Sequence, residues 1–366
     1  MPSVVAYPRV PANVRAQALV CLLALLAPTA RAQPPASTIE APVRSIYNFI
    51  HTTGDAERAF AFYRDVFGIA LDHSTFVRPA EADAPAPRIR TVAEARSDPL
   101  VWDLTDTHGS RFRTVFMHAP NTPFGLELSE FFDIPRLERP ANPWDTGAST
   151  LIFAVQDLDA ITTRLESAAA PIVTLGGAPI DTPVGRTMLV RDPDGYLIQV
   201  VQASRAAITS AAAPGAVIGT SIGITVSDMA AALAFYSDLL GFEIRGTRRV
   251  TADELRVQGL EAGRLTQTTT VIPGTGAIVL ISEFDPPGEA AEPTETYRWR
   301  IQDVGAPQFQ LEVAGLDALL QRTRDSGYRF LSIGGRPIER PFGRFVFVRD
   351  ADGIPVEYVE PTVVGE

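Results

Sequence analysis

The sequence predicts an α+β protein built from four βαβββ modules, two in each half of the chain. An internal repeat is the first evidence: Leu175–Gln202 returns as Ile333–Glu360 at a constant offset of 158 residues, with 13 of 28 positions identical. A strand followed by a capped helix also recurs between the two halves, which is the second evidence. Internal repetition says more about architecture than any single motif. The 366 residues are enough for two domains of about 150 residues each.

Residues 1–32 are predicted to be a secretory signal peptide. Arg9 and Arg15 precede an apolar run at Ala18–Ala27, and Ala30–Ala32 fits a small-residue cleavage site. The run is far shorter than the ~20 residues that span a bilayer, so a retained anchor is the weaker alternative. We therefore expect cleavage near Ala32 and a mature protein that is periplasmic or secreted, without a membrane contact.

The composition of the mature chain excludes several functions. Its only cysteine, Cys21, lies inside the predicted signal, so the mature protein has neither a disulfide nor a thiol nucleophile. Without the three signal arginines, 29 basic residues face 43 acidic ones, a formal charge of −14. Such a charge argues against nucleic acid and anionic membranes as partners. We expect a small molecule as the partner.

The first module is predicted from its strand and its helix caps. Residues 33–43 are rich in Pro and Ala and are expected to be a flexible lead-in. A strand follows at Ser45–Ile50, Asp55 caps a helix, and Gly68 ends it as a C′ residue. The helix face predicted to be buried consists of Ala59, Phe62, Tyr63 and Val66.

The same unit returns 173 residues later as the third module. Ser221–Val226 is the strand, Asp228 the cap and Gly241 the stop. The predicted buried face consists of Ala232, Phe235, Tyr236 and Leu239. Paired aromatic residues at helical spacing are most often core, and we interpret both pairs in this way.

Each odd module then has a variable segment and two more strands. The longer segment, Arg78–Arg111, has the length of a functional lid or of disordered chain, and we expect it to shape access to a pocket. The strands that follow the variable segments are Arg113–His118 and Phe124–Glu130 in the first half, and Thr268–Ile272 and Ala277–Glu283 in the second.

The even modules end in the long repeat. A strand from Thr150 and a helix opened by Asp157 have their copies at Gln308–Val313 and in the helix from Leu316. Asp-Gly pairs at 194–195 and 352–353 predict hairpin turns. The predicted domains are 44–203, from modules 44–133 and 145–203, and 218–361, from modules 218–286 and 303–361, with a linker at 204–217.

This βαβββ unit, used in pairs, resembles the vicinal oxygen chelate (VOC) superfamily, which includes glyoxalase, bleomycin-resistance and extradiol dioxygenase proteins. The matching residues are Asp55, Phe62-Tyr63 and Gly68, their copies Asp228, Phe235-Tyr236 and Gly241, and in the even modules Asp157-Leu158-Asp159, Asp192-Pro193-Asp194-Gly195 and Asp350 with Asp352-Gly353. The resemblance covers nearly all of the mature chain. It implies that two modules curl into an open, barrel-like sheet around one pocket.

In the metal enzymes of this superfamily, a His on the first strand and a Glu on the last strand of each module hold a divalent ion. The first-strand positions here are Asn48, Thr150, Ser221 and Gln308, and the last-strand positions are Glu127, Gln199, Leu280 and Glu357. None is His, and six of the eight depart from the family pattern. We therefore expect no transition-metal centre and no cofactor.

How the modules pair decides what these positions form. If neighbours pair, which we favour because each half then folds alone, each pocket has a single carboxylate. If modules one and four pair, Asn48, Glu127, Gln308 and Glu357 form an all-oxygen set that suits Mg, Mn or Ca. The other pocket, with Thr150, Gln199, Ser221 and Leu280, would then be inert. A divalent ion is expected only in this second arrangement.

Glu127 and Glu357 alternate with apolar residues along their strands. Their side chains are therefore expected to face the side of the sheet opposite to those apolar residues. A buried carboxylate needs a partner or a shifted pKa. We favour structural ion pairs, with Arg186 and Arg344 as candidates. Contact with a ligand and a role as a catalytic base are the alternatives.

The four histidines, His51, His73, His108 and His118, all lie in the first module and away from the family's ligand positions. His118 is predicted on the strand beside Glu127, so we include it among the pocket candidates, although a structural role is more common. Asp192 and Asp194 resemble the start of a calcium loop, but Ala203 stands where its bidentate Glu belongs, so we reject calcium there.

Three functions follow from these observations. The first is an exported protein that binds a small organic molecule in a barrel-lined pocket without a transition metal. The alternative is a lyase, isomerase or dioxygenase relative that uses Glu127 or Glu357, with or without an oxygen-ligated ion. The third is a scaffold whose pockets are filled by its own Phe and Trp side chains. An open pocket with Glu127 reachable by solvent would favour the first two.

Overall fold

The computed structural model describes residues 41–73, 86–138, 140–211, 216–285 and 299–362. The predicted signal peptide and most of the lead-in lie outside these ranges. Each module has the order strand, helix, three strands, so the predicted α+β fold of four βαβββ modules is confirmed. Within the described ranges, every helix is too short or too polar to span a bilayer.

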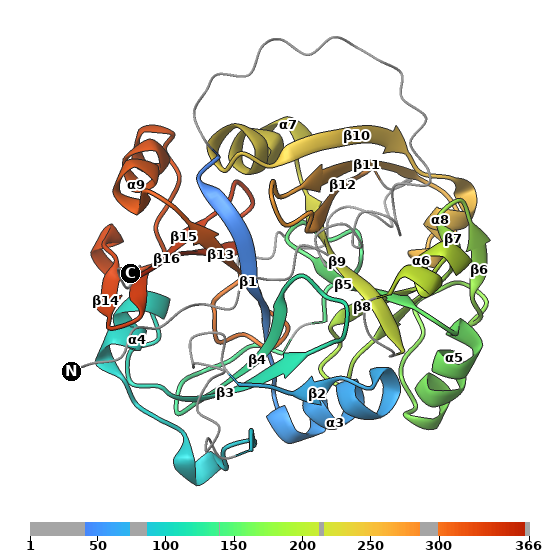
Figure 1. Ribbon diagram of the computed structural model, residues 1–366, viewed down its shortest axis with the longest axis horizontal. Helices are drawn as coiled ribbons and strands as arrows, with labels where there is room; N and C mark the ends of the chain where they lie inside the picture. The colour runs from blue at the N-terminus through green and yellow to red at the C-terminus, as the bar shows by residue number, and fades with distance from the viewer. Residues whose placement is uncertain (1–40, 74–85, 139, 212–215, 286–298, 363–366) are drawn as a thin grey trace.

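In the described residues the strands form two eight-stranded sheets (Figure 1). The first sheet has the order β14-β15-β16-β13-β1-β4-β3-β2, and the second has the order β10-β11-β12-β9-β5-β8-β7-β6. The strands of the first sheet are β1 (Val43–Thr52), β2 (Ala70–Leu71), β3 (Arg111–His118), β4 (Gly125–Phe132), β13 (Pro307–Val313), β14 (Ile338–Arg340), β15 (Gly343–Arg349) and β16 (Pro355–Pro361). Those of the second are β5 (Ser149–Val155), β6 (Ile180–Thr182), β7 (Gly185–Arg191), β8 (Leu197–Gln202), β9 (Val217–Val226), β10 (Glu243–Arg249), β11 (Arg264–Val271) and β12 (Ile278–Asp285).

Module one therefore shares a sheet with module four, and module two with module three. The expectation that neighbouring modules of each half pair is wrong. At the centre of each sheet the first strands of two modules run antiparallel, β1 with β13 and β5 with β9. Since only residues 203–216 separate β8 from β9, the chain enters module three directly beside module two.

The module helices follow the predicted caps. Helix α3 (Ala56–Phe67) begins after Asp55, whose carboxylate accepts from the Arg58 backbone N–H, and ends at Gly68 with φ of 71°. A side chain at that φ would be strained, which explains the glycine. In module three, α7 (Met229–Leu233) continues as a π-helical turn, η2 (Ala234–Leu239). The even modules contribute α5 (Leu158–Ser167) and α9 (Leu316–Asp325).

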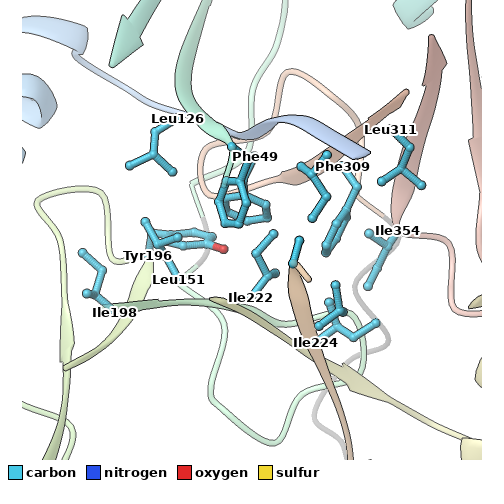
Figure 2. Close-up of a cluster of buried hydrophobic side chains, with 14 of the residues drawn as sticks. Phe49, Leu126, Leu151, Tyr196, Ile198, Ile222, Ile224, Phe309, Leu311 and Ile354 are labelled. Carbon is cyan, nitrogen blue, oxygen red and sulfur yellow. The ribbon is translucent and has the colours of Figure 1, made fainter. Parts of the chain in front are cut away.

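The hydrophobic core lies between the two sheets (Figure 2). Phe49 and Leu126 of the first sheet face Leu151 and Ile222 of the second in this buried cluster. Successive side chains of a strand point to opposite faces. The residues that alternate with this core therefore lie on the opposite face of each sheet, which we call the site face.

Two inserted helices pack across the module pairs. Helix α4 (Pro99–Thr105), preceded by the 3₁₀ turn η1 (Val92–Glu94), belongs to module one but contacts β14 and β15 of module four. Helix α8 (Ala252–Val257) of module three likewise contacts β6 and β7 of module two. A further 3₁₀ turn, η4 (Ile333–Gly335), lies beside α4. The predicted linker contains a short helix, α6 (Arg205–Ser210).

Candidate functional site

Four polar side chains meet on the site face of the first sheet, and we call them the central quartet: Asn48 of β1, Glu127 of β4, Gln310 of β13 and Glu357 of β16. Asn48 Nδ2 donates to Gln310 Oε1 at 2.8 Å and lies 3.4 Å from Glu127 Oε2. Gln310 Nε2 donates to Glu357 Oε2 at 2.8 Å. Ser129 Oγ donates to the other oxygen of Glu127 at 3.2 Å. Amides and a hydroxyl thus link two carboxylates.

Both carboxylates of the quartet are buried. Glu127 is 7% exposed and Glu357 is 4% exposed. Burial raises the pKa of Glu127 to about 7, although the hydrogen bonds from Ser129 and Asn48 act to lower it. Burial raises the pKa of Glu357 to about 8, and the nearby charge of Glu127 adds to this shift. Both groups therefore exchange protons near neutral pH.

The protein's own side chains cover this site face. Leu104 of α4 belongs to the same buried cluster as Phe131, which lies on β4 like Glu127, and Phe347, which pairs with Glu357. The full cluster is Leu104, Phe131, Ile301, Leu331, Ile338, Phe345, Phe347 and Val359. Ser332 Oγ donates to the carbonyl of Leu104 at 2.7 Å and holds the helix in place. This crowding is what the scaffold interpretation expects of the first sheet.

Gln308, which the sequence placed in this set, lies two residues too early. Its amide contacts Thr52 Oγ1 at 3.3 Å, whereas Gln310 pairs with Glu357 in the strand register. The sequence pattern does not contain the register of β13 with β16, which places Gln310 beside Glu357. A register match with Glu357 would have found it. In the second sheet, the same offset of 158 residues points to Ile152 rather than Thr150.

Three other predicted contacts are wrong. Arg186 pairs with Asp159, and Arg344 pairs with Asp317 and Glu360, so neither arginine reaches the quartet glutamates. Both lie near the start of their strand, where the acidic first turn of a helix is closer. His118 is exposed at the end of β3, where it pairs with the edge strand β2.

The site face of the second sheet contains a hollow of about 70 Å³. At the positions equivalent to the quartet stand Ser221, Leu280, Ile152 and Gln199. Of these, Ile152, Gln199 and Leu280 line the hollow. Ser221 is buried and Thr150 is half-buried, and neither is part of this lining. These positions supply no carboxylate or imidazole for an ion.

Polar residues from β10, β11 and α8 complete the hollow. Arg248 donates to both oxygens of Glu254, at 2.8 and 2.6 Å, so the charges balance. Burial would raise the pKa of Glu254, but hydrogen bonds from Arg248 and Thr251 hold it below its usual value. Gln258 Nε2 donates to Gln199 Oε1 at 3.1 Å. The two charged side chains that line the hollow, Arg248 and Glu254, therefore balance, and its other lining residues are apolar or uncharged.

A separate buried polar cluster joins modules one and two. His51 Nε2 lies 3.0 Å from Tyr63 Oη, and Tyr63 donates to Asp192 at 3.2 Å. The His51 ring stacks on Tyr196 with 4.5 Å between centroids. In the other half, Tyr236 donates to Asp350 at 2.8 Å, and Ile224 stands where His51 would be. His51 is thus an addition to a duplicated structural contact, which argues against a role in either site face.

The donor chemistry limits which metals fit. Among the described residues, no group of three or more His, Cys, Asp and Glu could hold an ion. The quartet has two carboxylates and two amides. The Gln310 NH₂ donates to Glu357, and the Asn48 NH₂ donates to Gln310 Oε1 and lies 3.4 Å from Glu127. Oxygen-seeking ions fit this set only if both amides turn their oxygens inward. Ions that need imidazole or thiolate ligands do not fit it.

Comparison with known proteins agrees with the fold. Residues 48–200 and 220–358 match the family model described as Glyoxalase/Bleomycin resistance protein/Dioxygenase superfamily. Glyoxalase I from Zea mays has a similar structure, with a TM-score of 0.53 and 16% identity over 86% of this chain and 92% of its own. A putative dioxygenase from Bacillus subtilis has a TM-score of 0.53 and 12% identity over 88% and 87% of the two chains. No curated protein matches.

Proposed function

This chain belongs to the glyoxalase/bleomycin resistance protein/dioxygenase superfamily, and from that premise we propose that it binds a small organic molecule in the hollow of the second sheet, without a transition metal. One observation carries the proposal. The two site faces are equivalent by duplication, but the first is packed with aromatic side chains and the second keeps a hollow of about 70 Å³. Ligand pockets are typically concave and apolar with a few placed polar groups, as this one is.

A single pair of positions illustrates the difference. In the first sheet Phe116 pairs with Glu127, and in the second Thr269 stands at the equivalent place opposite Leu280. Thr269 lines the hollow. A Phe at 269 would therefore fill the second site face with a residue that the fold already accommodates in the first.

The test is a ligand screen by thermal shift and saturation-transfer NMR on residues 33–366. Compounds that bind the wild type should lose binding in Thr269→Phe. They should keep it in Phe116→Thr, the matched change in the first sheet. A screen in which no compound responds to Thr269→Phe would refute binding in the hollow.

The central quartet supports a second candidate function, an enzyme of the lyase, isomerase or dioxygenase type. Modules one and four do share a sheet, which is the arrangement that brings Glu127 and Glu357 together. Their raised pKa values suit proton transfer near neutral pH. If Asn48 and Gln310 turn their oxygens inward, the four side chains could hold Mg, Mn or Ca, which would polarise a bound oxygen.

Metal analysis separates this candidate from the first. The mature protein would be purified without chelator, beside Glu127→Gln and Glu357→Gln. Stoichiometric Mg, Mn or Ca that is lost in both variants would favour the enzyme. If none of the three ions changes the melting temperature, the ion-dependent form of the enzyme candidate has no support.

We also propose export, on the strength of the basic, apolar and small-residue segments in residues 1–32. N-terminal sequencing of the protein from the periplasm or medium should give Gln33 as the first residue. A full-length chain retained in the cytoplasm would contradict export.

A further inference from the structure

The hollow of the second sheet has a polar character that narrows its ligand class, and this inference rests on the proposed function. We infer that it takes the amide end of a neutral molecule, a primary amide or a lactam whose C=O and N–H lie side by side. The observation behind it is the pair of glutamine amides, Gln199 and Gln258, that lines the hollow together with apolar residues.

Charge in the hollow is already balanced. Glu254 accepts from Arg248 through both oxygens and from the Thr251 backbone N–H at 2.8 Å. Its side chain is 11% exposed and that of Arg248 is 33% exposed. An entering carboxylate could share Arg248 with Glu254, but two negative charges would then face one guanidinium. An entering ammonium would meet a Glu254 whose oxygens already accept from Arg248 and Thr251. Either charged ligand would leave an uncompensated charge in a partly buried site, so a neutral ligand is favoured.

The two amides leave a matched donor and acceptor. Gln258 Nε2 donates to Gln199 Oε1 at 3.1 Å. This orientation leaves Gln199 Nε2 as a donor and Gln258 Oε1 as an acceptor, each without a protein partner among the contacts of the described residues. A ligand amide offers a C=O to the first and an N–H to the second. A carboxylate offers no donor at neutral pH, and an ammonium offers no acceptor.

The size of the hollow fits an end group. Its volume of about 70 Å³ is roughly half of the ~150 Å³ that holds a benzene molecule in an engineered cavity. The apolar residues Ile152, Val201 and Leu280 line it together with the amides. An amide with a short alkyl or ring segment therefore enters, and the rest of a larger molecule stays outside.

The experiment compares three probes of one chain length: hexanamide, hexanoate and hexylamine. Affinities for residues 33–366 are measured by saturation-transfer NMR at pH 7. We expect hexanamide to bind at least tenfold more tightly than the other two, because each charged probe loses one of two hydrogen bonds and disturbs the Arg248–Glu254 pair. Gln199→Met, which keeps the side-chain length but removes the amide, should weaken hexanamide about tenfold. Gln321→Met, on the exposed face of α9, is the control.

The outcomes separate this inference from the proposed function. If hexanoate or hexylamine binds as tightly as hexanamide and Thr269→Phe abolishes binding, the hollow binds ligands but the amide class is wrong. Unchanged hexanamide binding in Gln199→Met also overturns the inference. If neither the probes nor the screened compounds respond to Thr269→Phe, the proposed function fails and the inference fails with it.

Discussion

The side-chain amides of Asn48 and Gln310 meet at 2.8 Å in the centre of the first sheet, although 262 residues separate them in the chain. Each amide also faces one buried carboxylate, Glu127 or Glu357. The contact therefore joins the first and last modules and places two acidic groups in one buried site. Their protonation is linked to folding, which leads to the first prediction.

Glu357→Gln is expected to flatten the pH dependence of stability. The pKa of Glu357 rises from 4.5 to about 8 on folding, so between these values the native state holds a proton that the unfolded state has lost. The free energy of unfolding then falls as pH rises, by on the order of 1 kcal/mol per pH unit for this group. Urea denaturation between pH 5 and 8 should show a smaller loss in the variant.

Some slope will remain in Glu357→Gln, because the pKa values of Glu127, Asp192 and Asp350 are also raised to about 7. Glu166→Gln, at an exposed position, should follow the wild type throughout. Parallel curves for wild type and Glu357→Gln would show that Glu357 is already ionised in the native protein at pH 5.

Gly125→Ala is expected to destabilise the protein by about 1–3 kcal/mol, the usual cost of overpacking a filled site. A Cβ at this position would lie 2.3 Å from Asn48 Oδ1, so the amide would have to leave Gln310. In the second sheet the equivalent residues are Ile278 and Ser221, where the small serine leaves room for the larger side chain.

A double-mutant cycle tests this explanation. The cost of Gly125→Ala, measured by urea denaturation, should shrink in an Asn48→Ser background, because the clashing amide is gone. An equal cost in both backgrounds would mean that the glycine serves the backbone of β4 rather than the amide.

The repeats predicted the elements well because caps and periodicity are local. Asp55 and Gly68 mark the true ends of α3, and the offset of 158 residues aligns the even modules through their last strands. The pairing of modules depends on which strand edges meet across the whole chain, and no local pattern records this. Gln310 was missed for the same reason, since the side chain beside Glu357 follows from the register of β13 with β16.

The hollow could not be predicted from the sequence either. Its lining comes from α8, β10, β11 and β12 of one module and from β5 to β8 of another. The residues that keep it open are small ones such as Thr269, where the copy has Phe116. The residues Thr150, Gln199, Ser221 and Leu280, which we expected to form an inert pocket, thus lie on the sheet that contains the hollow. A site without metal donors can still have room for a ligand.

Thr174→Val and Ser332→Ala are each expected to cost about 1–3 kcal/mol, since each leaves buried backbone groups without a partner. Thr174 Oγ1 donates to the carbonyl of Val257 at 3.2 Å and accepts from the Leu189 N–H at 2.7 Å. Ser332 makes the same two contacts with Leu104 and Phe347, at 2.7 and 2.8 Å.

Hydrogen exchange distinguishes the hydrogen bonds of Thr174, which hold α8, from those of Ser332, which hold α4. Each variant is the control for the other. Thr174→Val should speed exchange in α8 and leave α4 unchanged, and Ser332→Ala should do the reverse. Faster exchange in both helices of either variant would indicate global destabilisation rather than the release of one helix.

His51→Ile is expected to stabilise the protein relative to the wild type as the pH falls. Burial lowers the pKa of His51 to about 4, although Asp194 opposes the shift. Between pH 6.5 and 4 the unfolded chain therefore binds a proton at this residue, whereas the native state does not. The contribution of His51 to the free energy of unfolding then falls as pH falls through this window, by on the order of 1 kcal/mol per pH unit. The buried carboxyl groups have the opposite effect, but they are present in both proteins and cancel in the comparison. Urea denaturation should therefore show the variant gaining stability relative to the wild type as the pH falls from 6.5 to 5.

The second half of the chain shows that the fold accepts isoleucine at this position. Ile224 occupies the equivalent place there, and Tyr236 still bonds Asp350 without a histidine. His51 Nδ1 is buried without a hydrogen-bond partner, so the isoleucine should also leave stability at pH 8 unchanged or higher. His118→Gln, at an exposed position, is the control and should follow the wild type. A variant that loses stability equally at every pH would mean that the stacking of His51 on Tyr196 outweighs the cost of burying its ring nitrogen.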